Sequence, residues 1–261
     1  MIKLIACDLD GTLLPPSKIM PEETFPLIKK MSEDGVIFVP ASGRQLPNLE
    51  LLFAPVLDEI AIIAENGGLC WHKGKVIYIN PTPADGLLYA LDIIRSEQGL
   101  YPLLSGTDCA YYESGDEQFI DVLYKSYSRA EKVDDLNEVA RRETILKISV
   151  WDKQPAAEHA ANVLIPRIKG LRTKVSGFDW LDVSVATANK GEALNALLSH
   201  LNIAKSQSVA FGDHMNDLEM LQASGRGYVT ANGFPELKRL VPNIIPSNAE
   251  NGVITKIKEL L

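Results

Sequence analysis

Two carboxylates that face the same side of an extended segment stand near the N-terminus, in the sequence Asp8-Leu9-Asp10-Gly11-Thr12. Side chains at positions i and i+2 of an extended segment lie on one side, so we expect Asp8 and Asp10 to be neighbours. Two like charges held together repel each other unless a cation lies between them or one group is protonated. The pattern predicts a cation site, although a lone Asp-x-Asp-Gly is more often a polar strand end followed by a turn.

Three other segments carry reactive side chains where a strand ends or a helix begins. Ser42 and Gly43 follow an apolar run, where a hydroxyl and backbone N–H groups can bind a phosphoryl oxygen or simply cap a helix. Lys190 opens a helix, where a cation is disfavoured by about 0.3–1 kcal/mol, and this unfavourable place indicates a nearby anion. A solvated surface lysine is the alternative explanation. The segment Gly212-Asp213-His214-Met215-Asn216-Asp217 is suited to Mg²⁺ or to a plain helix start.

The elements that must position these groups alternate between strand and helix at both ends of the chain. Short apolar runs at residues 36–40, 60–64 and 208–212 are typical of parallel strands that are buried on both faces, and helical patterns separate them. Because ligands bind at the carboxyl ends of such strands, we expect the reactive segments to converge there.

The middle of the chain lacks this alternation and shows paired strands, together with helices that include one over residues 155–170. We therefore predict an α/β fold with a doubly wound, mostly parallel sheet, interrupted by an inserted α+β domain. The predicted catalytic domain comprises residues 1–83 and 186–261, and the insertion comprises residues 84–185.

Composition narrows the class of protein. The chain has 261 residues, 46% of them hydrophobic and 23% charged, with a net charge of -8. This charge argues against a nucleic-acid partner, and no apolar run reaches the roughly 20 residues that span a bilayer. Three dispersed cysteines fit a reducing compartment, and four histidines without metal-ligand spacing argue against zinc. We expect a cytoplasmic protein, either a monomer or a homodimer.

Together the four segments resemble the motifs of the haloacid dehalogenase (HAD) superfamily of phosphatases. The sequences ASGR, ENGG, NKGEAL, GDHMND and SNAENGV resemble the Cof-type subfamily, in which a large α/β cap of the C2B type is inserted between the second and third motifs. The resemblance covers both ends of the chain and implies a Rossmann-like core. The insertion matches a cap in position and size, but its residues carry little family signal.

The resemblance implies a role for each motif residue. Asp8 would be the nucleophile that forms an aspartyl phosphate, and Asp10 the general acid and base. Mg²⁺ would be held by the Asp8 carboxylate, the backbone carbonyl of Asp10 and the Asp213 carboxylate. The resemblance further implies that Lys190 offsets charge at the phosphoryl group and that Asn216 and Asp217 hold water or orient Lys190.

The resemblance also implies which residues bind the substrate. Thr12, Ser42, Gly43 and Lys190 would bind the phosphoryl oxygens. Arg44 and Asn66 are weaker candidates for contacts with the substrate or the cap. The alternative for Arg44 is an exposed Arg at a helix start. The alternative for Asn66, which is the favoured explanation of that residue, is an Asn that supplies a positive-φ turn before Gly67.

The function that the resemblance implies is a Mg²⁺-dependent phosphatase of small phosphorylated metabolites, such as a sugar phosphate or a phosphorylated cofactor. A phosphomutase or phosphotransferase would use the same aspartyl phosphate and transfer it to a hydroxyl. A phospho-receiver switch also contains an acidic pocket, but it is a domain of roughly half this length and needs neither Asp10 nor a cap. A binding module that has lost catalysis is disfavoured, because Asp8, Asp10, Lys190 and Asp213 are all present.

Overall fold

The computed structural model describes residues 1–261, and the chain divides into two compact units, described separately below. The core unit comprises Met1–Ser42, Leu49–Tyr78 and Asn189–Leu261, and the inserted unit comprises Gly43–Asn48 and Ile79–Ala188. The inserted unit begins at Ile79 and ends at Ala188, each a few residues from the predicted bounds of 84 and 185. The assignment of Gly43–Asn48 to the inserted unit was not predicted.

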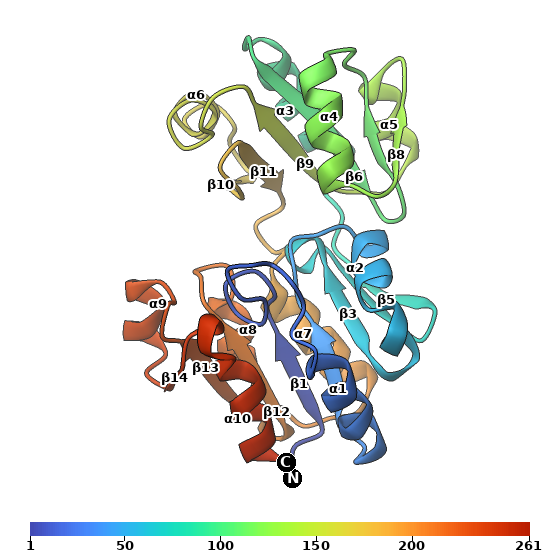
Figure 1. Ribbon diagram of the computed structural model, residues 1–261. Helices are drawn as coiled ribbons and strands as arrows, with labels where there is room; N and C mark the ends of the chain where they lie inside the picture. Colours follow the sequence, from blue (N-terminus) through green and yellow to red (C-terminus); the bar gives the residue numbers. More distant parts are fainter. The chain divides into compact units, whose positions relative to one another are not determined.

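The core unit is built on a five-stranded parallel sheet in the order β14-β13-β12-β1-β2 (Figure 1). Strand β1 lies between β12 and β2, with Leu4 paired to Ser208 on one side and to Ile37 on the other. All residues of β1 and β12 are buried, as in a parallel sheet covered on both faces. The strands are β1 (Leu4–Cys7), β2 (Ile37–Pro40), β12 (Ser208–Gly212), β13 (Arg226–Thr230) and β14 (Ile244–Ile245).

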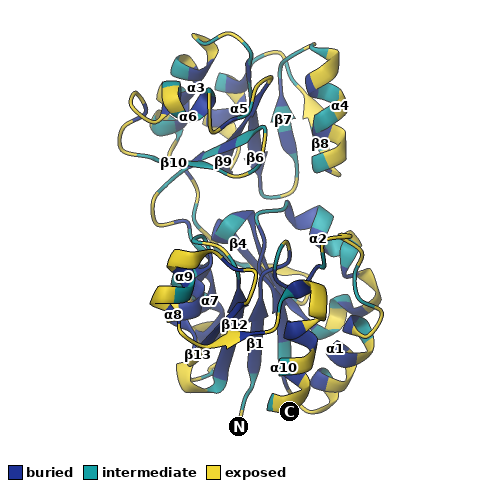
Figure 2. Cartoon of the chain, turned by 60° about the vertical axis from the view of Figure 1, so that its left-hand side comes forward, coloured by how far each residue is buried: buried dark blue, intermediate teal, exposed yellow.

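Helices cover both faces of this sheet (Figures 1 and 2). Helix α7 buries Ala193, Leu194 and Leu197, whose spacing places them on one helical face against the strands. Helix α8 packs beside α7 in the same apolar cluster, and α1 and α10 cover the opposite face. The core helices are α1 (Thr24–Glu33), α7 (Lys190–His200), α8 (Leu218–Ala223), α9 (Pro235–Leu240) and α10 (Gly252–Leu260); helix α2 (Leu46–Leu52) begins in the inserted unit and ends in the core unit.

A small antiparallel sheet extends the core beyond β2. It consists of β3 (Ala61–Ala64), β4 (Leu69–His72) and β5 (Lys75–Ile79), and Ile63 of β3 forms a parallel bridge to Ala41 at the end of β2. The mostly parallel α/β fold predicted from the sequence is confirmed. No helix of the chain combines the length and the apolarity needed to cross a bilayer.

The inserted unit contains a six-stranded sheet in the order β10-β11-β9-β6-β7-β8, antiparallel except for the parallel β7–β8 pair. The strands are β6 (Leu100–Gly106), β7 (Ala110–Tyr112), β8 (Ala130–Lys132), β9 (Ile145–Asp152), β10 (Arg172–Val175) and β11 (Trp180–Ser184). The helices are α3 (Ala84–Arg95), α4 (Glu117–Ser126), α5 (Leu136–Arg142) and α6 (Ala160–Leu164).

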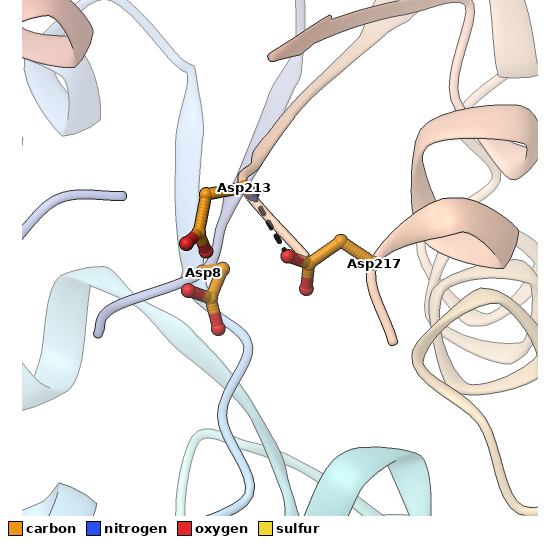
Figure 3. A group of neighbouring side chains, drawn as sticks. All are labelled: Asp8, Asp213 and Asp217. Atoms are coloured by element: carbon orange, nitrogen blue, oxygen red, sulfur yellow. Dashed lines mark hydrogen bonds between the residues drawn. The ribbon is translucent and has the colours of Figure 1, made fainter. Parts of the chain in front are cut away.

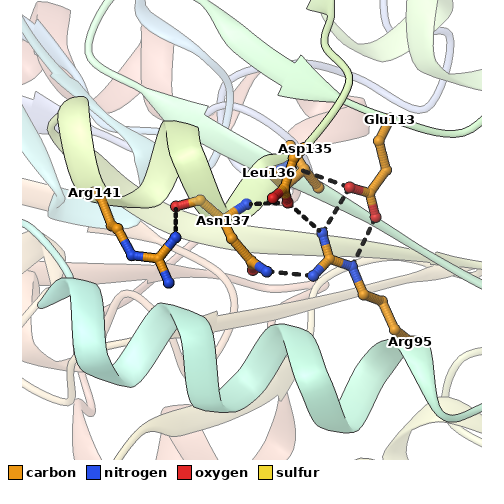
Figure 4. Close-up of polar contacts among 6 residues, drawn as sticks. All are labelled: Arg95, Glu113, Asp135, Leu136, Asn137 and Arg141. Atoms are coloured by element: carbon orange, nitrogen blue, oxygen red, sulfur yellow. Dashed lines mark hydrogen bonds and ion pairs between the residues drawn. The ribbon is translucent and has the colours of Figure 1, made fainter.

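Alternate residues of β9 face opposite sides of this sheet. Ile148 and Val150 pack in an apolar cluster with α3, α5 and α6, whereas Trp151 packs with Phe119 and Leu123 of α4. A polar network at the surface also ties α3 to α5 (Figure 4): the Arg95 guanidinium donates to the carboxylates of Glu113 and Asp135 and to the side-chain oxygen of Asn137. The inserted unit therefore has its own core on each face of its sheet.

Candidate active site

Three of the candidate residues follow neighbouring strands of the parallel sheet at the same edge. Asp8 comes directly after β1, and its N–H donates to the carbonyl of Phe211 in β12 at 3.0 Å. Asp213 comes directly after β12, and Ser42 lies two residues beyond the end of β2. Since β1 lies between β2 and β12, the carboxyl ends of the three strands bring these residues to one edge of the sheet.

The ammonium group of Lys190 binds two carboxylates at this edge. Its Nζ donates to Asp8 Oδ1 at 2.5 Å and to Asp217 Oδ1 at 2.7 Å, and the side chain is fully buried. The other oxygen of Asp217 accepts from the backbone N–H groups of Asp213 and His214, at 3.0 and 3.1 Å. Asp217 therefore positions Lys190 and also shapes the loop that presents Asp213.

Three carboxylates lie close together at this edge of the sheet (Figure 3). Ligand atoms of Asp8, Asp213 and Asp217 all lie within 4.8 Å of one another. If all three are ionised beside one lysine, the local charge is −3 + 1 = −2. A divalent cation would neutralise this charge, and carboxylate oxygens are the hard ligands that Mg²⁺ prefers. The donor set therefore fits Mg²⁺. Asp8 and Asp213 are the better candidates for metal ligands, because both oxygens of Asp217 already accept hydrogen bonds.

Burial and the excess of negative charge raise the pKa values of two of these carboxyl groups. Burial, and then the charge of Asp217, raise the pKa of Asp8 to about 8 despite the adjacent Lys190. Burial and Asp217 also raise the pKa of Asp213. Burial alone would lower the pKa of Lys190, but Asp217 and Asp8 outweigh it and raise that pKa. The shared carboxylates thus favour the charged form of Lys190, but this single cation does not offset the effects that favour the protonated forms of Asp8 and Asp213.

Close approach of Asp213 to the N-terminal loop depends on Gly11. Gly11 has a φ of +89°, and a Cβ at this position would lie 2.2 Å from Asp213 Oδ2. The hydroxyl of Thr12 donates to the other oxygen of Asp213 at 3.0 Å. The small residue and the hydroxyl, both part of the motif, therefore place the Asp213 carboxylate beside the loop that carries Asp8.

The turn Glu65–Gly67 touches two of the other segments. Asn66 has a φ of 53°, as predicted for a turn residue, and its side-chain oxygen accepts from Asn216 Nδ2 at 3.2 Å. Gly67 has a φ of +93°, and a Cβ there would lie 2.1 Å from the carbonyl oxygen of Asn189. The turn therefore packs directly against the residue that precedes Lys190.

The remaining predicted residues differ in exposure. Thr12 and Ser42 are buried, whereas the side chain of Asp10 is exposed. Gly43 and Arg44 are half-buried and belong to the inserted unit.

Comparison with known proteins decides the family. The family described as haloacid dehalogenase-like hydrolase matches residues 5–257, which is nearly the whole chain. The protein is a HAD-like hydrolase. The resemblance inferred from the four motifs is confirmed.

Curated relatives of this HAD-like hydrolase are named as phosphatases. The chain is 27% identical to 5-amino-6-(5-phospho-D-ribitylamino)uracil phosphatase of Escherichia coli (strain K12), over 100% of this chain and 96% of that protein. It is 26% identical to the HMP-PP phosphatase of Cronobacter sakazakii, over 94% of this chain and 89% of that protein. The expectation of a phosphatase within this family agrees with these names.

Solved structures share the fold over the full length. A protein from Eubacterium rectale superposes with a TM-score of 0.87 at 28% identity, covering 100% of this chain and 99% of that one. The protein SMU.1108c from Streptococcus mutans gives a TM-score of 0.86 at 25% identity, with the same coverage.

Two asparagines in the C-terminal part of the HAD core were not predicted to serve the site. Asn232 Nδ2 donates to the carbonyl of Gly11, and Asn248 Nδ2 donates to the carbonyl of Leu14, each at 2.8 Å. Asn232 also accepts from the backbone N–H of Asn248 at 3.0 Å. They anchor the loop after Asp8 from the far end of the sequence. The motif SNAENGV, which contains Asn248, was the signal that could have indicated such a role.

Proposed function

We propose that this HAD-like hydrolase is a Mg²⁺-dependent phosphatase of small phosphorylated metabolites that works through an aspartyl phosphate on Asp8. The observation that carries the proposal is the buried Lys190 ammonium between Asp8 and Asp217. A carboxylate attacks a phosphate group only if the charges of both are offset, and this arrangement provides one cation and the ligands for another.

The proposed reaction has two steps. An oxygen of Asp8 forms a bond to phosphorus while the bond from phosphorus to the ester oxygen breaks, and Asp10 gives a proton to the departing oxygen. A water molecule then attacks the aspartyl phosphate, Asp10 takes a proton from this water, and inorganic phosphate and free Asp8 result. The exposure of the Asp10 side chain is compatible with access to both a leaving group and water.

Charge and hydrogen bonds in the site would favour these steps. Asp8, Asp213 and the backbone carbonyl of Asp10 would hold Mg²⁺, which supplies positive charge for the phosphoryl oxygens when it is bound. Lys190 offsets the charge of the Asp8 nucleophile. The buried hydroxyls of Thr12 and Ser42 and the backbone N–H of Gly43 would bind the non-bridging oxygens.

The substrate class is inferred from the site and from the named relatives. The Escherichia coli relative is named for a phosphorylated ribityl compound of small size. We infer a metabolite of similar size, such as a sugar phosphate or a phosphorylated cofactor, with Arg44 and Asn66 as candidate contacts beyond the phosphoryl group.

The test is phosphate release from a panel of phosphorylated metabolites, with Mg²⁺ and with EDTA, for the wild type and for Asp8→Asn. We expect release that needs both Mg²⁺ and Asp8. Water labelled with ¹⁸O should place its label in the released phosphate. Transfer of the phosphoryl group to an added sugar, without uptake of ¹⁸O from water, would instead identify a phosphotransferase.

A further inference from the structure

The segment Gly43–Asn48, which follows Ser42, is held within the inserted unit by reciprocal hydrogen bonds to residues 126–129. Gln45 is buried; its Nε2 donates to the carbonyl of Arg129 at 3.1 Å, and its Oε1 accepts from the N–H of Arg129 at 3.4 Å. Asn48 Nδ2 donates to the carbonyl of Ser126 at 2.9 Å. Asn48 Oδ1 accepts from both the N–H and the hydroxyl of Ser128, at 2.9 and 2.8 Å.

A buried ion pair supplies a third anchor for the same segment. Lys147 Nζ, on β9, donates to the carbonyl of Gly43 at 3.3 Å and to Asp182 Oδ2 at 2.9 Å. The other oxygen of Asp182 accepts from the hydroxyl of Ser149 at 2.9 Å. The side chains of Lys147 and Asp182 are only 7% and 12% exposed, so water competes little for these bonds.

Ser42 itself is held by the core unit. Its N–H donates to the carbonyl of Ile63, and its carbonyl accepts from the N–H of Asn66, both at 2.9 Å. Ser42 is therefore the last residue fixed by one unit, and Gly43 is the first residue fixed by the other. The peptide bond between them joins a proposed phosphate-binding hydroxyl to the anchored segment.

We infer that Gln45, Asn48 and Lys147 are positioning residues that couple the phosphate-binding hydroxyl of Ser42 to the inserted unit. Anchoring of Gly43–Asn48 restricts the backbone at Ser42, so the hydroxyl takes up its phosphate-binding position when the inserted unit holds this segment. A misplacement of about 1 Å at such a group costs on the order of a hundredfold in rate. The inference rests on the proposed function, in which Ser42 binds a phosphoryl oxygen.

The test is a double-mutant cycle on kcat with Mg²⁺ and the preferred substrate of the panel. Asn48→Ala removes three hydrogen bonds, and we expect kcat to fall about tenfold. In a Ser42→Ala background the same change should lower kcat less than twofold, because the hydroxyl that the segment positions is no longer present. Asn48→Asp keeps the acceptor for Ser128 and loses the donor to Ser126, so it should retain more activity than Asn48→Ala.

A matched control separates coupling from general loss of structure. Asn162 also donates from its amide to a backbone carbonyl of the inserted unit, that of Glu158 at 2.7 Å, and Asn162→Ala should leave kcat unchanged. Melting temperatures show whether each variant is folded, and Gln45→Glu, which keeps one of two bonds, replaces Asn48→Ala if that variant unfolds.

The outcomes distinguish the coupling from the function. Equal losses from Asn48→Ala with and without Ser42, or no loss at all in the folded variant, would overturn the coupling while leaving the phosphatase assignment intact. A Ser42→Ala variant with normal kcat would also overturn it. Absence of Asp8-dependent phosphate release from the wild type would instead overturn the proposed function.

Discussion

The Lys190 ammonium lies 2.5 Å from the carboxylate of Asp8, a residue that stands 182 positions earlier in the chain. Both groups are buried, and Asp217 shares the same lysine. The fold thus holds one ammonium group in direct contact with two carboxylates.

The stability of the metal-free protein should depend on pH through Asp8. The folded-state pKa of about 8 lies above the ordinary value of 3.8, so the folded state binds an extra proton between these values. The free energy of unfolding should therefore fall as pH rises from about 4 to 8. Urea unfolding in EDTA should show that Asp8→Asn gains stability over the wild type at pH 8.5 and gains less at pH 5. Parallel pH curves for the two proteins would contradict the raised pKa. The variant should have no turnover.

Binding of Mg²⁺ should release protons at neutral pH. Asp8 is largely protonated at pH 7 without metal, and a metal ligand must lose this proton. Calorimetry in two buffers of different ionisation enthalpy should yield a net release, and Mg²⁺ affinity should rise with pH. Asp213→Asn should weaken the affinity, whereas Asp116→Asn, at the half-buried N-cap of α4 in the inserted unit, serves as the control. Binding without proton exchange would place the metal away from Asp8.

Replacing Lys190 by Met should cost about 3–5 kcal/mol of stability, because it leaves buried carboxylates without their partner. The loss should be measured by urea unfolding in EDTA. Added Mg²⁺ should recover part of it, since the cation meets the same carboxylates. Turnover should remain absent even where the protein is folded. A stability equal to that of the wild type would show that the lysine is not needed to hold the acidic cluster.

The Asp10→Asn variant should discriminate between leaving groups. A poor leaving group needs a proton as it departs, so the loss of kcat for a sugar phosphate should be about 10²–10⁴-fold. The loss for 4-nitrophenyl phosphate should be much smaller, because nitrophenolate leaves without a proton. Equal losses for both substrates would argue against Asp10 as the acid.

The packing of the turn Glu65–Gly67 against Asn189 can be tested with two glycines. Gly67→Ala and Gly74→Ala both place a side chain at positive φ, which costs about 1–2 kcal/mol in each. Only Gly67→Ala drives a Cβ into the backbone of Asn189. A Cβ added at Gly74 would meet no heavy atom within 4 Å. We expect kcat to fall at least tenfold more in Gly67→Ala than in Gly74→Ala. Similar activities in the two variants would show that the turn does not position Lys190.

Several site residues that the sequence indicated adjoin buried strands, whereas Lys190 was indicated by its disfavoured place at a helix start. Asp8 and Asp213 each follow a short apolar run, and such runs predict parallel strands whose ends meet. The parts it did not indicate depend on contacts between distant residues. Anchoring of Gly43–Asn48 requires Arg129 and Ser128, and nothing in the local sequence specifies that pairing.

Secondary structure in the inserted unit shows the same limit. Residues 155–170 were predicted as one helix, but only Ala160–Leu164 are α-helical. The carboxylate of Asp152 accepts from the N–H of Ala160 at 2.8 Å and sets the start, and Pro166 cannot continue the helix. Strand β8 (Ala130–Lys132) was not predicted, since its residues are mostly exposed and its pairing with β7 comes from the tertiary structure.

The position of β1 between β2 and β12 determines when each of its two partner strands becomes available during synthesis. Its neighbour β2 follows within a few dozen residues, but its other neighbour, β12, begins at Ser208. At about 5–20 residues per second, β1 leaves the ribosome roughly 10–40 s before that partner strand. All residues of the inserted unit emerge within this interval. The nascent chain therefore carries an open, apolar strand edge until β12 emerges, after the inserted unit is complete, and this stage is the one most exposed to misassembly and to chaperones.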